Sequence, residues 1–212
     1  MTKADKTTLI FTSIVTLLPI PAGLILWSRL PESMAIHFGL GGEADGYASR
    51  AMGVFCLPLV LLAVHWLAAF VIARDPRKQN LSPKVRALTL WLVPVLSVVL
   101  CGVVYAVNLG VGVDVKLVVG LALSVMLLVV GNYLPKARQN YTVGIRLPWT
   151  LANEENWNRT HRLAGFLWMG AGALMAVLTL CRAHLVWLLL LLALAAAVPI
   201  GYSLWLHAKK GL

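Results

Sequence analysis

The residues best suited to binding or chemistry gather in one polar loop between two apolar segments, over residues 135–162. The loop is rich in Asn, Arg, Trp, His and Gly, which supply hydrogen-bond donors, rings that stack and tight turns. Together these residue types predict a built binding site. Its candidate residues, which include one Asn just before the loop, are Asn132, Pro135, Lys136, Asn140, Gly144, Arg146, Pro148, Trp149, Asn153, Trp157, Thr160 and His161.

The second half of this loop is predicted to be the start of a helix, since nothing between Glu154 and the next apolar run breaks it. Asn153 is the predicted N-cap, because its side chain can accept the free backbone N–H groups of the first turn. Glu154 and Glu155 then lie in the first turn, where the helix dipole favours negative charge.

The first half of the loop is expected to present Arg146, whose guanidinium offers several fixed donors. Pro148 and Trp149 follow directly and should stiffen and anchor the turn that carries it. His161 lies one helical turn after Trp157 and is expected to hydrogen-bond back to that turn. Taken singly, the two tryptophans also suit interfacial anchors, and the basic residues suit lipid headgroup contacts.

A second candidate segment, residues 29–50, is rich in glycine and acidic residues and contains His37, Glu43, Asp45, Gly46 and Tyr47. His37, Glu43 and Asp45 could in principle bind a metal ion, but their spacing matches no strong metal template, and the glycines indicate tight turns. We therefore predict neither a metal nor a cofactor. The sequence has no GxSxG, HExxH or P-loop pattern, so we also predict that the chain is not an enzyme.

Six apolar runs must position these two segments. Of the 212 residues, 60% are hydrophobic and only 12% are charged, which is more apolar than a soluble domain tolerates. About 20 apolar residues are needed for a helix to cross the hydrocarbon core. The sequence therefore predicts an all-α, polytopic transmembrane helical bundle that forms a single membrane domain over residues 1–212. The predicted spans are residues 7–28, 51–73, 87–109, 117–134, 163–180 and 185–206.

The predicted spans contain several prolines but no central Asp, Glu, Lys or Arg. Proline kinks are tolerated in membranes when neighbouring helices satisfy the freed carbonyl groups. The absence of central charges disfavours ion-coupled transport. His65, in the second span, is better explained as a histidine hydrogen-bonded between helices than as a proton relay.

The distribution of positive charge predicts the orientation. Of the 18 Lys and Arg residues, only Arg29, Arg50, Lys116 and Arg182 lie in segments that would be outside if the N-terminus is inside. Because Lys and Arg in short loops resist translocation, both termini and the polar loop are predicted to be cytoplasmic, and residues 29–50 extracytoplasmic. The net charge of +10 is thereby explained without nucleic-acid binding, for which no supporting motif is present.

The polar loop and its flanks also contain a series of motifs. They read NYLPK from Asn132, NYTVGIR from Asn140, PWTL from Pro148 and NEENWNRTHRLAG from Asn153. This series resembles the signature of the SdpI family of bacterial membrane immunity proteins, and the LP, IHF and DGY elements of residues 29–50 resemble its N-terminal companion segment. Leu147 and Ala152 depart from the family pattern, which favours Thr and Ser there; the second change moves the expected helix cap to Asn153.

The resemblance implies a multi-pass protein of the bacterial cytoplasmic membrane that confers resistance to a secreted antibacterial toxin or peptide. The implied partners are membrane lipids, the toxin and a cytoplasmic transcriptional repressor that the protein would recruit to the membrane. Two other classes stay open from the residues alone. One is a small-solute transporter or channel, and the other is a membrane-embedded enzyme acting on lipid or peptide at the inner interface.

Overall fold

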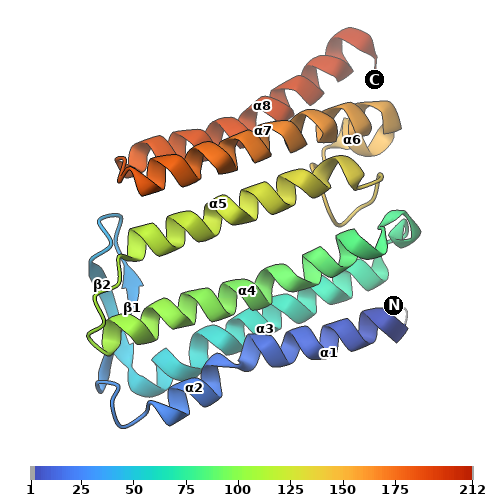
Figure 1. Cartoon of the computed structure of the whole chain (residues 1–212). Helices are drawn as coiled ribbons and strands as arrows, with labels where there is room; N and C mark the ends of the chain where they lie inside the picture. Colours follow the sequence, from blue (N-terminus) through green and yellow to red (C-terminus); the bar gives the residue numbers. More distant parts are fainter. Residues whose placement is uncertain (1–2, 212) are drawn as a thin grey trace. The chain divides into compact units, whose positions relative to one another are not determined.

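The computed structural model describes residues 3–211, which form long helices and one short hairpin (Figure 1). Two short 3-10 turns, η1 (Lys78–Asn80) and η2 (Leu134–Lys136), lie in the connections. In chain order, the regular elements are α1 (Lys3–Leu17), α2 (Pro19–Ile25), β1 (Ser33–Phe38), β2 (Ala44–Ser49), α3 (Arg50–Arg74), α4 (Pro83–Asn108), α5 (Val115–Tyr133), α6 (Pro148–Ala152), α7 (Glu154–Leu180) and α8 (Leu185–Lys210).

The described residues contain six segments long and apolar enough to cross a membrane, one for each predicted run. They are Asp5–Ile25, Arg50–Arg74, Pro83–Asn108, Val115–Lys136, Glu154–Leu180 and Leu185–Lys210. The prediction of a polytopic helical membrane protein is therefore confirmed. The first helical segment ends at Ile25, three residues before the predicted end, because the chain turns over residues 26–29.

The chain packs as two compact units. The N-terminal unit comprises the described residues up to Phe70 together with Ala87–Val119, and the C-terminal unit comprises Val71–Arg86 and the described residues from Gly120 onward. The expected single membrane domain stays a prediction, because a compact packing unit is not the same thing as an independently folding domain.

Residues 29–50 form an antiparallel hairpin rather than the irregular loop that the all-α prediction implied. Strand β1 pairs with β2 in the register Ser33 with Ser49 and Ala35 with Tyr47. The turn is tight, as the glycines indicated: Gly39 donates its backbone N–H to the carbonyl of Glu43 at 2.8 Å, and Gly42 has a φ of +86°. The strands are only six residues long and one contains glycine, so their sequence carries little strand signal.

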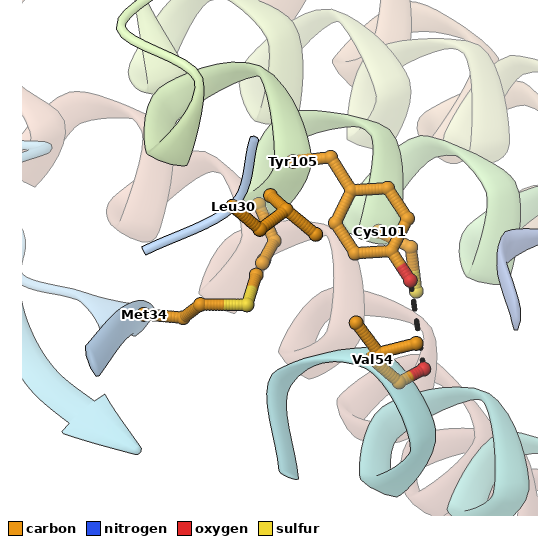
Figure 2. Packing of buried hydrophobic residues seen from close by; sticks show 6 residues of the cluster. Leu30, Met34, Val54, Cys101 and Tyr105 are labelled. Atoms are coloured by element: carbon orange, nitrogen blue, oxygen red, sulfur yellow. Dashed lines mark hydrogen bonds between the residues drawn. The ribbon is translucent and has the colours of Figure 1, made fainter. Parts of the chain in front are cut away.

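The core of the N-terminal unit joins the base of this hairpin to α3 and α4. Its buried members include Leu30, Met34, Val54, Cys101 and Tyr105 (Figure 2). The Tyr105 hydroxyl lies 3.5 Å from the Val54 carbonyl oxygen and 2.9 Å from that of Pro19. Pro58 has no N–H for the Val54 carbonyl four residues earlier, and the group that faces this freed carbonyl is the tyrosine hydroxyl, which it shares with the closer Pro19 carbonyl.

Helix α4 also stabilises the break between α1 and α2 by polar contacts. Ser97, two helical turns before Tyr105, donates its hydroxyl to the Thr16 carbonyl at 2.8 Å. On α3, the Nε2 atom of His65 lies 2.9 Å from the Thr12 hydroxyl of α1, and both side chains are fully buried. The expectation of a histidine hydrogen-bonded between helices is therefore confirmed.

In the C-terminal unit, α7 and α8 form a hairpin and lie side by side (Figure 1). The indole Nε1 of Trp168 on α7 donates to the Ala195 carbonyl of α8 at 2.9 Å. Ala195 lies four residues before Pro199, so its carbonyl is the one that the proline leaves without a helical partner. An aromatic donor on a neighbouring helix again satisfies the freed group, as expected for a membrane protein.

Small residues let α5 approach α7 closely in the same unit. A Cβ atom added at Gly165 would lie 2.8 Å from the Gly131 carbonyl oxygen, and one added at Gly172 would lie 2.8 Å from that of Ser124. Because the two backbones nearly touch, these glycines are needed for packing.

Candidate functional site

The polar loop is organised around Asn140, whose side chain is fully buried. Its Oδ1 accepts the backbone N–H groups of Thr142 at 2.8 Å and Val143 at 2.6 Å. Its Nδ2 donates to the carbonyls of Arg138 at 2.8 Å and Val143 at 3.0 Å. The amide thereby satisfies four backbone groups and fixes a turn that has no regular secondary structure.

Trp157 and His161 hold this turn against the start of α7. The Trp157 indole is completely buried and donates to the Ala137 carbonyl at 2.7 Å. The ring of His161 stacks on it with the centroids 4.0 Å apart. The interpretation of Trp157 as an interfacial lipid anchor is therefore wrong, because its ring is enclosed by protein.

Both ring nitrogens of His161 are occupied. The backbone N–H of Ile145 donates to Nε2 at 2.9 Å, so Nε2 must be unprotonated, and Nδ1 then donates to the Trp157 carbonyl at 2.8 Å. The expected hydrogen bond from His161 back to the turn before Arg146 is thus present. Gly144 permits the approach: its φ is +123°, and a Cβ atom there would lie 2.3 Å from Nε2.

The segment around Arg146 ends in the short helix α6, whose first residue is Pro148, a favourable position for proline. Thr150 is fully buried, and its hydroxyl lies 2.9 Å from the Ile145 carbonyl oxygen and 2.9 Å from the Leu147 backbone nitrogen. Sequence reasoning missed Thr150, because a lone threonine beside a proline and a tryptophan carries no distinctive signal.

A second segment, the connection between α3 and α4, is bonded to the polar loop. Asp75 is only 4% exposed, and its Oδ2 accepts the Tyr141 N–H at 2.9 Å and the Thr142 hydroxyl at 2.6 Å. Its Oδ1 accepts the backbone N–H of Arg77 at 2.7 Å. Three neutral donors therefore hold a buried carboxylate in the centre of the site.

Gln139 makes a further connection between the same segments. Its side chain accepts from the Arg77 guanidinium and donates to the Thr150 carbonyl at 2.8 Å, while its own carbonyl accepts from Asn80 at 2.7 Å. Sequence reasoning missed both Gln139 and Asp75. The available signal was Asp75 itself, the one acidic residue in an otherwise basic linker.

The end of α8 completes the site. The Trp149 indole donates to the Ser203 hydroxyl, and its ring stacks on His207 at 5.6 Å. Asn156 donates to the Ser203 carbonyl at 3.0 Å and accepts from the Thr160 hydroxyl at 3.0 Å. Polar contacts from α6 and α7 thus meet α8 at Ser203, a residue that no sequence pattern indicated.

The predicted N-cap of α7 is present, and charges follow it. Asn153 Oδ1 accepts the backbone N–H groups of Glu155 at 2.9 Å and Asn156 at 3.0 Å. Glu155 pairs with Arg159 one turn later. The negative first turn and the cap agree with the expected start of this helix.

The predicted site residues divide into a framework and an exposed surface. The buried framework consists of Asn140, Trp157, Thr160 and His161, and Gly144, Trp149 and Asn153 are partly buried. Asn132, Pro135, Lys136, Arg146 and Pro148 are exposed. Arg146 donates through one nitrogen to the Tyr141 carbonyl at 2.9 Å, which fixes the side chain while the residue stays exposed.

The exposed surface is cationic, since Lys136, Arg138, Arg146, Arg159 and Arg162 are all exposed. Glu155 is bonded to Arg159, so it neutralises only part of this charge. A rigid polar framework that presents several guanidinium groups can bind carboxylate or phosphate groups.

The candidate residues of the outer segment lie together on the hairpin. His37 Nδ1 and Asp45 Oδ1 are 2.5 Å apart, and both side chains are exposed. Gly46 faces His37 across the strands, and Tyr47 is 63% exposed. Glu43 lies over the turn glycine Gly41. Over residues 3–211, no three His, Cys, Asp or Glu side chains are grouped as a metal site would need.

Comparison with known proteins covers both segments. Residues 136–203 match the SdpI/YfhL protein family, and residues 14–62, which include the hairpin, match a domain of unknown function (DUF1648). The chain is 26% identical over 203 residues to the immunity protein SdpI of Bacillus subtilis (strain 168), and the alignment covers 96% of each chain. No solved structure matches the chain. The resemblance read from the motifs is therefore confirmed: the chain is a multi-pass bacterial membrane protein that is similar to the SdpI family over residues 136–203 and to an immunity protein over almost its whole length.

Proposed function

We propose that this chain protects a bacterium against a secreted antibacterial peptide or toxin, and that the polar loop is its working site. The similarity to an immunity protein over almost the whole of both chains is the observation that carries this proposal. The design of the loop supports it. The buried side chains of Asp75, Asn140 and His161 form hydrogen bonds with backbone groups of the loop. The exposed Arg146 side chain is held by one hydrogen bond to a backbone carbonyl.

The arrangement suits recognition by a preorganised surface. Because Tyr141 and Trp157 are fixed by Asp75 and Ala137, the segment that carries Arg146 does not have to become ordered when a partner binds. A partner with a carboxylate or phosphate would meet donors already in place. A cytoplasmic repressor held at the membrane by this surface would link immunity to gene expression, which is the second part of the proposal.

The proposal requires that the hairpin and the polar loop lie on opposite sides of the membrane, with both termini in the cytoplasm. Glu43→Cys and Glu154→Cys, introduced singly after Cys56, Cys101 and Cys181 are replaced by alanine, place a thiol on each exposed segment. A membrane-impermeant maleimide should label position 43 in intact cells, and position 154 only after permeabilisation. Labelling of both positions in intact cells would contradict the six-span topology.

The proposed working site can be tested by survival. A sensitive bacterium that expresses the unmodified chain should survive challenge with the cognate secreted toxin, and Arg146→Ala should abolish most of this protection while the protein still accumulates in the membrane. A lost hydrogen bond to a charged group costs about 1.5–3 kcal/mol, which corresponds to roughly ten- to hundredfold weaker binding. Arg146→Lys should protect only in part, because lysine lacks the planar fork of donors.

Leu194→Ala is the matched control, since Leu194 is 59% exposed on α8 and makes no polar contact in the site. It should protect as well as the unmodified chain. Failure of the unmodified chain to protect would overturn the immunity proposal itself. Full protection by Arg146→Ala would keep the immunity function but remove the polar loop as its working site.

A further inference from the structure

The β1–β2 hairpin has one edge that is already occupied by a side chain. The carboxamide of Asn108 on α4 accepts the Ala35 N–H at 2.8 Å and donates to the Ala35 carbonyl at 2.8 Å. Asn108 therefore pairs with Ala35 as a neighbouring strand would, with one donor and one acceptor. At Ala35 the outer edge of β1 therefore has no free backbone groups with which another strand could pair.

The register shows where the second edge lies. Arg50 donates its backbone N–H to the Glu32 carbonyl at 2.8 Å, so the backbone groups of this residue pair point toward each other across the hairpin. In an antiparallel ladder such pairs alternate with pairs whose backbone groups point outward, and Ala35 opposite Tyr47 is of the outward kind. The N–H and C=O of Tyr47 consequently face away from β1, and among residues 3–211 neither forms a backbone hydrogen bond outside the β1–β2 ladder.

This second edge is short and has a register irregularity beside Gly46, but no side chain of the described residues blocks it at Tyr47. Strand β2 reads ADGYAS and contains neither proline nor lysine. Ile36, Leu40 and Tyr47 are 42%, 73% and 63% exposed, and they lie between the first and second candidate spans rather than within one. Apolar side chains and unpaired backbone groups thus occur together outside the membrane-spanning segments.

Charge on the hairpin indicates what kind of strand would pair with it. Residues 33–49 contain Glu43 and Asp45 but no Lys or Arg, although the whole chain has a net charge of +10. Asp45 and Tyr47 are both exposed on β2, and one oxygen of the Asp45 carboxylate is bonded to His37. Lys116 contributes one cation at the turn, where its aliphatic stem lies beside Gly42. An opposite charge on a paired strand is stabilising, whereas a second acidic copy of β2 would gain nothing from charge.

We propose that the outer edge of β2 binds an extended, cationic peptide segment by strand addition, centred on the backbone of Tyr47. Backbone pairing would supply the affinity, and Asp45 together with the exposed side chain of Tyr47 would select a strand that carries both basic and apolar residues. This binding does not depend on the immunity function proposed above.

The test uses the full chain in lipid nanodiscs and a fluorescent peptide, Lys-Val-Thr-Val-Thr-Lys. Fluorescence anisotropy should show saturable binding that weakens about tenfold or more when alternate peptide amides are N-methylated, since each lost backbone hydrogen bond costs about 1 kcal/mol. Tyr47→Pro should abolish binding, because it removes an N–H that the hairpin itself does not use. Tyr47→Phe is the matched control and should bind normally.

Selection by charge is tested by exchanging both lysines of the peptide for glutamate. The unmodified chain should prefer the lysine peptide, and Asp45→Asn should reduce that preference. Equal binding of the N-methylated and unmodified peptides, or unchanged binding by Tyr47→Pro, would overturn the proposal; the peptide comparison decides even if Tyr47→Pro fails to fold. Concentration-dependent dimers lost in Tyr47→Pro would instead assign the edge to a second copy of the chain and overturn the proposal.

Discussion

Gly165→Val should prevent the C-terminal unit from reaching its folded state. The added side chain would begin 2.4 Å from the Pro135 Cγ atom and 2.8 Å from the Gly131 carbonyl oxygen, so it would force α7 away from α5 and from the start of the polar loop. Overpacking a tight contact costs about 1–3 kcal/mol when the surroundings can yield, and backbone atoms yield poorly. We expect little folded protein in the membrane.

Gly170→Val is the control for this change, because it lies on the same helix and a Cβ atom there has no atom from another part of the chain within 4 Å. It should accumulate as the unmodified chain does. The measurement is the amount of monodisperse protein extracted in mild detergent, followed by its thermal unfolding. Equal yield and equal midpoint for the two variants would show that the close approach of α5 and α7 is not required.

Trp157→Ala should have the second large effect, by releasing the polar loop. The change removes a fully buried ring, its stacking on His161 and the hydrogen bond to Ala137. Truncating a buried aromatic residue costs about 3–5 kcal/mol. Trypsin should then cleave rapidly after Lys136, Arg138 or Arg146. In the unmodified chain these residues are exposed, but hydrogen bonds hold the backbone of the loop in place.

Two further variants separate the contributions of Trp157. Trp157→Phe keeps a ring for stacking but loses the indole donor, so cleavage should be intermediate, in line with about 1 kcal/mol for one hydrogen bond. Trp187→Ala removes a tryptophan that is 58% exposed on α8, and cleavage should be unchanged. If Trp157→Ala resists trypsin as well as Trp187→Ala does, the buried indole is not what holds the loop.

The spans and the start of α7 could be predicted because their signals are local. A run of about 20 apolar residues is sufficient to predict a membrane helix, and Asn153 before two glutamates is sufficient to place a cap. The contact between His161 and the loop could also be predicted from the sequence. Its two residues are only 16 positions apart, and the helical spacing from Trp157 to His161 defines the helix face from which it forms.

The missed features depend on contacts between segments distant in the chain. Asp75 bonds to residues 66 and 67 positions later, and Asn108 bonds to Ala35 from 73 positions away. All but the Asp75–Thr142 bond join a side chain to backbone groups, and a backbone group has the same chemistry at almost every residue. No residue pattern therefore distinguishes the correct partner. The hairpin was missed for a related reason, as its register is fixed by Asn108 and the core rather than by strong strand formers.

The interleaving of the two units has a consequence for protein engineering. Val71–Arg86 belongs to the C-terminal unit, although it connects two helices of the N-terminal unit. A fragment that begins at residue 120 would therefore lose Asp75, Arg77 and Asn80, and its loop would keep unpaired donors and acceptors that water or lipid would have to satisfy. A shortened protein that is meant to keep the site must therefore also contain the α3–α4 connection. Circular permutation, which can join this connection to the C-terminal unit, suits that purpose better than simple truncation.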